Sequence, residues 1–135
     1  MSTPAVAPRN VVDSSGWLEY LADGANAEFF APAIEDTEHL VVPAPCLLEV
    51  LKWVLRERRE DAVLQTAALM QQGHVVELDV ALATQAAQIG LRHRLPLADS
   101  VMLATAQVHG AVLWTQDADF EGIPEARYLP KHRPA

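Results

Sequence analysis

Short apolar runs alternate along the chain with longer segments in which apolar residues recur every three or four positions. The short runs predict four β-strands and a candidate fifth, at residues 10–13, 40–42, 75–78, 112–115 and 127–129. The longer segments predict helices at residues 17–21, 26–34, 47–58, 61–72, 81–94 and 98–109. Ser14, Ser15 and Gly16 form a turn between the first strand and its helix, and we expect a serine to cap that helix.

Strands that alternate with helices indicate parallel β–α–β units, in which helices cover both faces of one sheet. We therefore predict the α/β class, as a three-layer α/β/α sandwich with a central parallel sheet of four to five strands. The length of 135 residues suits one domain. We expect it to cover residues 10–130, between a flexible N-terminal tail at 1–9 and a short basic tail at 131–135.

The composition narrows the possible functions of this domain. Eighteen acidic residues against ten Lys and Arg give a net charge of −8, which argues against a protein that coats nucleic acid through bulk charge. Cys46 is the only cysteine, so the chain cannot form an internal disulfide or a cysteine-rich zinc site. The sequence carries no secretory signal and no apolar run of membrane-spanning length. We expect a cytoplasmic protein with no membrane partner.

Five acidic residues stand just after predicted strands or near the starts of predicted helices: Asp13, Glu49, Asp99, Asp117 and Asp119. Each position also has an ordinary structural explanation. Asp13 and the Asp117–Asp119 segment suit turns, Glu49 suits a solvated helix face, and Asp99 complements a helix dipole. Taken together, however, these positions converge on the edge of a parallel sheet where ligands bind.

Four or five carboxylates at one edge would repel one another, and some would take up protons unless a cation were present. Mg²⁺, or Mn²⁺ in its place, prefers oxygen ligands and keeps several waters, which suits an open carboxylate site. Such a site favours phosphodiester hydrolysis by a metal-activated water. The five histidines lack the paired spacing of a zinc site. The chain also lacks a glycine-rich phosphate loop and a G-x-S-x-G nucleophile motif.

Four segments resemble the acidic motifs of PIN-domain nucleases, and more narrowly those of VapC toxins from type II toxin–antitoxin systems. They are Val11-Val12-Asp13-Ser14-Ser15, Leu48-Glu49-Val50, Leu97-Ala98-Asp99-Ser100 and Leu113-Trp114-Thr115-Gln116-Asp117-Ala118-Asp119-Phe120. The resemblance covers roughly residues 10–130, nearly the whole chain. It implies a Mg²⁺-dependent endoribonuclease that acts on RNA, is inhibited by a cognate antitoxin protein and forms a homodimer.

The resemblance also implies a role for each acid. Asp13 and Asp99 would be the main metal ligands, and Asp117 would complete the site. Glu49 would hold metal-bound water or assist proton transfer, and Asp119 matches a less regular ligand position. Asp13, Glu49, Asp99 and Asp117 would thus be the catalytic set.

Neighbouring residues of the four motifs carry smaller expectations. Ser14 or Ser15 would donate a hydrogen bond to Asp13 or to a phosphate, and Thr115 would orient the acids from its strand end. Cys46 departs from the pattern, which has a small hydroxyl-bearing residue there.

Two other functions stay open at this stage. The first is a non-catalytic module of the same fold that would use its acidic edge only to bind a protein. The complete set of acids argues against this alternative. A structure-specific DNA nuclease would use the same metal chemistry. Outside the five acids, thirteen acidic residues remain against ten basic ones, so we expect non-specific RNA binding to be weak. Recognition would then depend on the shape or the single-stranded loops of the RNA.

Overall fold

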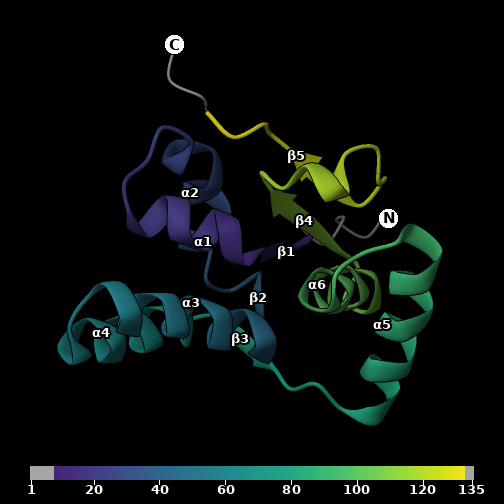
Figure 1. Ribbon diagram of the computed structural model, residues 1–135, viewed down its shortest axis with the longest axis horizontal. Coiled ribbons are helices and arrows are strands. Elements are labelled where there is room, and N and C mark those ends of the chain that lie inside the picture. The colour runs from purple at the N-terminus through teal and green to yellow at the C-terminus, as the bar shows by residue number, and fades with distance from the viewer. Residues whose placement is uncertain (1–7, 133–135) are drawn as a thin grey trace, which may run out of the picture.

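A computed structural model describes residues 8–132 of the chain. The predicted tails therefore lie mostly outside the described residues, at 1–7 and 133–135. The elements follow in the order β1 (Arg9–Val12), α1 (Ser14–Leu21), α2 (Ala27–Glu35), β2 (Leu40–Pro43), α3 (Ala44–Glu57), α4 (Glu60–Met70), β3 (His74–Val76), α5 (Val80–His93), α6 (Leu97–Val108), β4 (Ala111–Thr115), the 3₁₀-helix η1 (Ala118–Phe120) and β5 (Ala126–Tyr128) (Figure 1). Within residues 8–132, no helix is long and apolar enough to cross a membrane.

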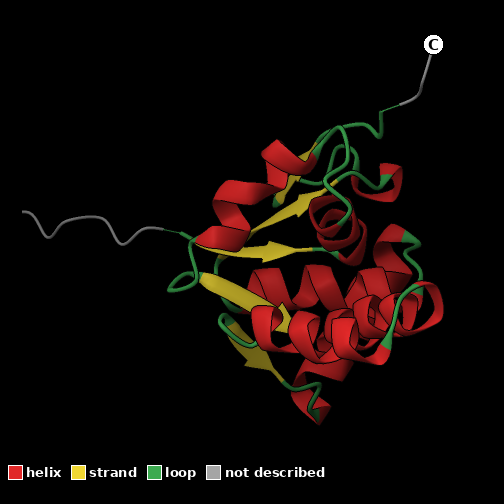
Figure 2. Cartoon of the chain, turned by 90° about the vertical axis from the view of Figure 1, so that its left-hand side faces the viewer, coloured by secondary structure: helices red, strands yellow, loops and turns green. Residues whose placement is uncertain are grey.

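The five strands form one sheet in the order β3-β2-β1-β4-β5, and every neighbouring pair is parallel. The strand arrows accordingly run the same way across the sheet (Figure 2). The predicted parallel sheet is confirmed, including the candidate fifth strand. Each predicted helix is also present, within three residues of its expected start.

Helices cover both faces of the sheet, as the three-layer prediction requires. The chain moves outward from β1 to β2 to β3 and then returns to the other side of β1 as β4. Because parallel crossovers are right-handed, this reversal places the helices after β3 on the opposite face from those before it. Figure 1 shows α1 to α4 on one side of the strands and α5 and α6 on the other.

The central strands and the helix α6 form the core. In β1 and β2 almost every residue is buried, and α6 is buried continuously from Ser100 to Ala106. Such unbroken apolar runs are typical of strands that are covered on both faces. Trp17 and Phe30 are fully buried in the core. The acidic edge is thus carried by elements that are fixed from both sides.

Two helix starts differ from the expectation for local reasons. Asp13, and not a serine, caps α1: its carboxylate accepts a hydrogen bond from the backbone N–H of Gly16. The predicted serine cap is therefore wrong, because the residue that ends the strand is itself a good cap. Helix α3 begins at Ala44, three residues before its predicted start, since proline is well tolerated in the first helical turn, where Pro45 lies.

The close packing of α1 on β1 and α2 depends on Gly16, and we predict that Gly16→Ala destabilises the protein. A Cβ at this position would lie 2.6 Å from Phe30 Cε1 and 2.7 Å from Val12 Cγ1, both in buried side chains. Overpacking of this kind costs about 1–3 kcal/mol of unfolding free energy, partly offset by the better helix propensity of alanine. Denaturant unfolding measures the loss.

The double variant Gly16→Ala/Phe30→Leu is the control for this steric explanation. Removing part of the Phe30 ring makes room for the added methyl group, so the two losses should be less than additive. Strict additivity would show that the clash with Phe30 is not the cause.

Candidate active site

The candidate site lies at the edge of the sheet where the strand order reverses. Chain segments leave the carboxyl ends of β1 and β4 in different directions, and this arrangement forms the crevice in which open parallel sheets bind ligands. Asp13 follows β1 directly, and Asp117 follows β4 after one intervening residue. Asp99 reaches the same edge from the first turn of α6. The strand ends thus bring together acids that are up to 104 residues apart in the chain.

Asp13 is a buried carboxylate with hydrogen bonds to both oxygens. It is 2% exposed, and its Oδ1 accepts from Ser15 Oγ at 2.8 Å and from the Gly16 N–H at 2.9 Å. Its Oδ2 accepts from Thr115 Oγ1 at 2.5 Å. Burial raises the pKa of Asp13 above its ordinary value, although these hydrogen bonds favour the charged form. The expected hydrogen bond from Ser15 is confirmed, and so is the contact from Thr115.

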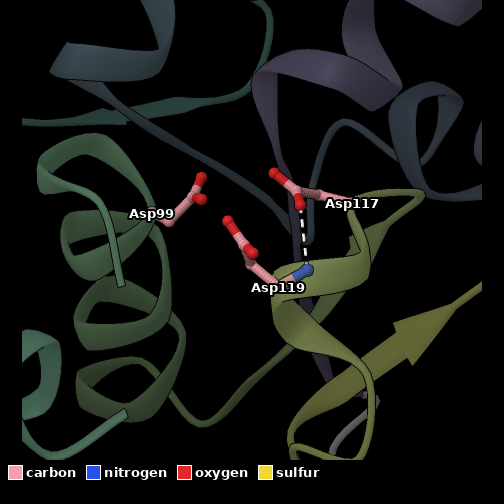
Figure 3. Close-up of side chains that lie close together, drawn as sticks. All are labelled: Asp99, Asp117 and Asp119. Atoms are coloured by element: carbon pink, nitrogen blue, oxygen red, sulfur yellow. Dashed lines mark hydrogen bonds between the residues drawn. The ribbon is translucent and has the colours of Figure 1, made fainter. Parts of the chain in front are cut away.

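Asp99, Asp117 and Asp119 form a tight carboxylate cluster at the mouth of the crevice. One carboxylate oxygen from each lies within 4.8 Å of the others, and Figure 3 shows the side chains of Asp99 and Asp119 reaching toward the same space from α6 and η1. Asp117 caps η1, where its Oδ1 accepts from the Asp119 N–H at 2.9 Å. This local turn brings two acids to one point. Asp119, the acid with the least regular expected role, is therefore part of the cluster, whereas the buried Asp13 is not.

The electrostatics of Asp99 show that the other four acids all act on its carboxylate. Desolvation is the main cause that raises the pKa of Asp99 to about 7, and the charge of Asp117 is the next. Asp13, Asp119 and Glu49 add further repulsion. The donor set fits a hard cation, because carboxylate oxygens are the ligands that Mg²⁺ prefers and a positive charge would relieve the repulsion.

Glu49 lies on the exposed side of the site, in α3, and is held by Ser14. Ser14 Oγ donates to Glu49 Oε1 at 2.6 Å. Ser14 thus contacts this acid and not Asp13. Below them, buried Cys46 lies 3.7 Å from Ser14 Oγ and donates to the Val12 carbonyl at 3.6 Å. The thiol therefore takes hydrogen-bonding contacts that a hydroxyl would make at this position.

Sequence reasoning missed a polar network around Gln116, which is 6% exposed. Its Oε1 accepts from Asn26 Nδ2 at 3.0 Å, and its Nε2 donates to the Ser15 carbonyl and to Glu19 Oε2, both at 3.3 Å. Glu19 Oε1 also accepts from the Asn26 N–H at 2.9 Å. The network joins the end of β4 to α1 and to the start of α2. The signal in the sequence was a polar residue between Thr115 and Asp117, directly after an apolar strand.

The fold and the site together define a class of protein: parallel α/β sandwiches with a carboxylate crevice at the point where the strand order reverses. The sequence matches the PIN domain family over residues 11–126. Because this match spans most of the chain, the protein belongs to the PIN domain family. A comparison with curated protein sequences gives no match.

Solved structures share the fold at low sequence identity. A toxin–antitoxin complex from Klebsiella pneumoniae aligns with a TM-score of 0.75 and 20% identity, covering 87% of this chain and 95% of that one. A VapC toxin from Mycobacterium tuberculosis, described as cleaving the sarcin–ricin loop, aligns at 0.69 and 20%, covering 84% and 94%. DNA-bound VapBC from Salmonella typhimurium aligns at 0.68 and 17%, covering 92% and 98%.

The raised pKa of Asp99 predicts how stability depends on pH in a chelator. Between pH 3.8 and about 7, the folded state holds a proton that the unfolded state has lost, so this group makes stability fall as pH rises. Asp99→Asn removes the charge. We expect the variant to be more stable than wild type above about pH 7 and the difference to disappear near pH 4.

Denaturant unfolding in EDTA across this pH range measures the effect. Asp79→Asn is the matched control, because Asp79 caps α5 by accepting from the Leu82 N–H and asparagine caps equally well. If wild type and Asp99→Asn show the same pH dependence, the pKa of Asp99 is not raised in the folded protein.

Proposed function

We propose that the protein is the toxin of a toxin–antitoxin pair and a divalent-metal-dependent endoribonuclease. The observation that carries this proposal is the convergence of five carboxylates at one crevice, with a pKa of about 7 for Asp99. A carboxylate that is desolvated and has four other acids around it is expected where function requires it, since stability alone disfavours the arrangement. The PIN family and the toxins of the same fold support the choice of nuclease.

Asp99, Asp117 and Asp119 would hold a Mg²⁺ ion, with Mn²⁺ as a substitute, and Asp13 would contribute from behind them. The ion would supply Lewis acidity at the phosphodiester and lower the pKa of the attacking water. Thr115 serves these residues from the strand end. Its hydroxyl donates to Asp13 and accepts from the Asp117 N–H at 2.9 Å, which fixes the relative position of the two acids.

Glu49 is the residue that we assign to proton transfer. Ser14 donates to its Oε1, which orients the carboxylate and leaves Oε2 to accept a proton from the attacking water. Its exposed position faces solvent, from which the water comes. Hydrolysis by water makes no use of the 2′-hydroxyl group. The products should therefore carry 5′-phosphate and 3′-hydroxyl ends.

Asp99→Asn tests the metal chemistry. We expect wild type to cut total cellular RNA at discrete sites in Mg²⁺ or Mn²⁺, to stop in EDTA, and to lose cleavage with Asp99→Asn. Glu49→Gln should lower kcat by about 100- to 10,000-fold, because it removes the proton acceptor. Mapping the new ends identifies the bond broken.

Asp79→Asn, the same chemical change at an acid outside the cluster, should cut like wild type. Ends with 2′,3′-cyclic phosphate would contradict hydrolysis by water. Cleavage of DNA but not RNA would favour the structure-specific DNA nuclease. No cleavage and no divalent-ion binding by folded protein would favour the protein-binding module.

An antitoxin protein and a second copy of the chain are the proposed protein partners. Structures of the same fold include toxin–antitoxin complexes, which supports the first. For the second, α5 and α6 enclose an apolar hollow of about 500 Å³. Leu91 and Leu97 line it while remaining 85% and 88% exposed. Large exposed leucines beside an apolar hollow are typical of a surface that another protein covers.

We predict a homodimer that uses this α5–α6 surface. The double variant Leu91→Arg/Leu97→Arg should shift the protein from dimer to monomer in sedimentation equilibrium, because charges would be buried without partners. Leu64→Arg on α4, at a leucine that is 74% exposed, is the control and should remain dimeric. A monomeric wild-type protein, or a variant that stays dimeric, would refute this interface.

A further inference from the structure

A second hollow adjoins the acidic crevice on the side of β5. Its volume is about 270 Å³, below the roughly 300–1,000 Å³ of pockets for drug-sized ligands and therefore closer to the size of a single ring system. Asp117 belongs to both sites. We call this hollow the Tyr128 pocket, and its lining residues are Gln116, Asp117, Ala118, Tyr128, Pro130 and Lys131.

Backbone and side-chain hydrogen bonds hold the walls of the Tyr128 pocket in place. Tyr128 pairs with Thr115 in the β4–β5 register, and the Leu129 N–H donates to the Thr115 carbonyl at 3.0 Å. Asn26 Nδ2 donates to the Pro130 carbonyl at 3.0 Å as well as to Gln116. The chain after β5 is thus tied both to the strand end and to α2. Thr115, which positions Asp13 and Asp117, is also the register partner of the aromatic wall.

The lining combines an aromatic ring with a free cation. Tyr128 is half-buried and is the one aromatic residue among those that line the hollow. Lys131 is exposed and is the one basic residue in the lining. The ion pairs found among residues 8–132 are His39–Asp36 and Arg56–Glu57, and neither includes Lys131. Gln116 has its amide occupied by the polar network, so it forms a wall and is not available to read a base.

We propose that the Tyr128 pocket binds one nucleotide of a single-stranded RNA next to the bond that is cut. The base stacks on Tyr128, and Lys131 pairs with a backbone phosphate. This inference rests on the proposed ribonuclease function and adds where the substrate lies. Stacking on an aromatic ring suits every base and is the usual way in which proteins hold unpaired nucleotides. It also needs no net positive charge, which a protein of net charge −8 lacks.

The test uses the Asp99→Asn protein, which is not expected to cut, and fluorescent single-stranded RNA of about eight nucleotides in Mg²⁺. Adding Tyr128→Ala should weaken binding about 5- to 150-fold, the range that corresponds to the loss of one stacked base. Tyr128→Phe keeps the ring and should keep the affinity. Lys131→Ala should reduce the slope of log affinity against log salt by about 0.7, the value for one phosphate contact on a single strand.

The chain provides matched controls, because it has two tyrosines and two lysines. Tyr20 in α1 and Lys52 in α3 are not among the residues that line the pocket. Tyr20→Ala and Lys52→Ala should leave both the affinity and its salt dependence unchanged. Circular dichroism establishes that each variant is folded. RNA that lacks one base near its centre should bind more weakly than intact RNA to the protein that keeps Tyr128. The Tyr128→Ala variant should bind both RNAs with the same affinity.

The outcomes separate this inference from the proposed function. In the cleavage-competent protein, Tyr128→Ala should lower kcat/KM for RNA by a similar factor while the ends and the metal requirement stay the same. Cleavage with no effect of Tyr128→Ala on binding or kcat/KM would overturn the pocket and leave the nuclease intact. RNA binding that depends on Tyr128, with no cleavage of RNA, would overturn the proposed nuclease activity and leave the pocket intact. If Tyr128→Ala weakens only inhibition by the antitoxin, the pocket serves that protein and the proposal is wrong.

Discussion

Asp13 is a carboxylate buried at the point where the strand order reverses, and its hydrogen bonds link three elements. Ser15 and the Gly16 N–H reach it from α1, and Thr115 reaches it from β4, while Asp13 itself ends β1. A buried charge costs free energy unless it is fully hydrogen-bonded, so these contacts must form together. The same contacts fix the ends of both strands. Asp117 takes its position relative to this point, because Thr115 bonds both acids.

The remaining acids lie in an arrangement that folding alone does not favour. Desolvation, together with repulsion from the other four acids, raises the pKa of Asp99 to about 7, so a charged carboxylate at this position costs free energy. Outside this set of acids, ordinary local rules hold for other parts of the fold: Asp79 caps α5, and apolar strands fill the core. A crevice that departs from those rules is expected to have a function.

The sequence predicted the fold because its strands and helices are strongly patterned, and the alternation of the two dictates a parallel sheet. The acids were found for a related reason, since each stands at a strand end or helix start. Their grouping was harder to foresee. Asp119 joins the cluster through a turn capped by Asp117, and the Gln116 network depends on contacts with Asn26 and Glu19, which lie about 90 residues or more away in the chain. Side-chain contacts of this kind leave no periodic signal.

The net charge of the protein explains why the acidic crevice and the Tyr128 pocket beside it would have to act together in binding RNA. A protein of net charge −8 repels a polyanion over most of its surface, so attraction must be local and must come from groups other than a basic face. A divalent cation held by the carboxylates would offset part of their negative charge and present a local positive centre to a phosphate. An aromatic surface beside it adds affinity that does not depend on charge or strongly on salt. An acidic nuclease would therefore bind an RNA well only where metal and ring act together, which restricts its action to unpaired nucleotides that fit both.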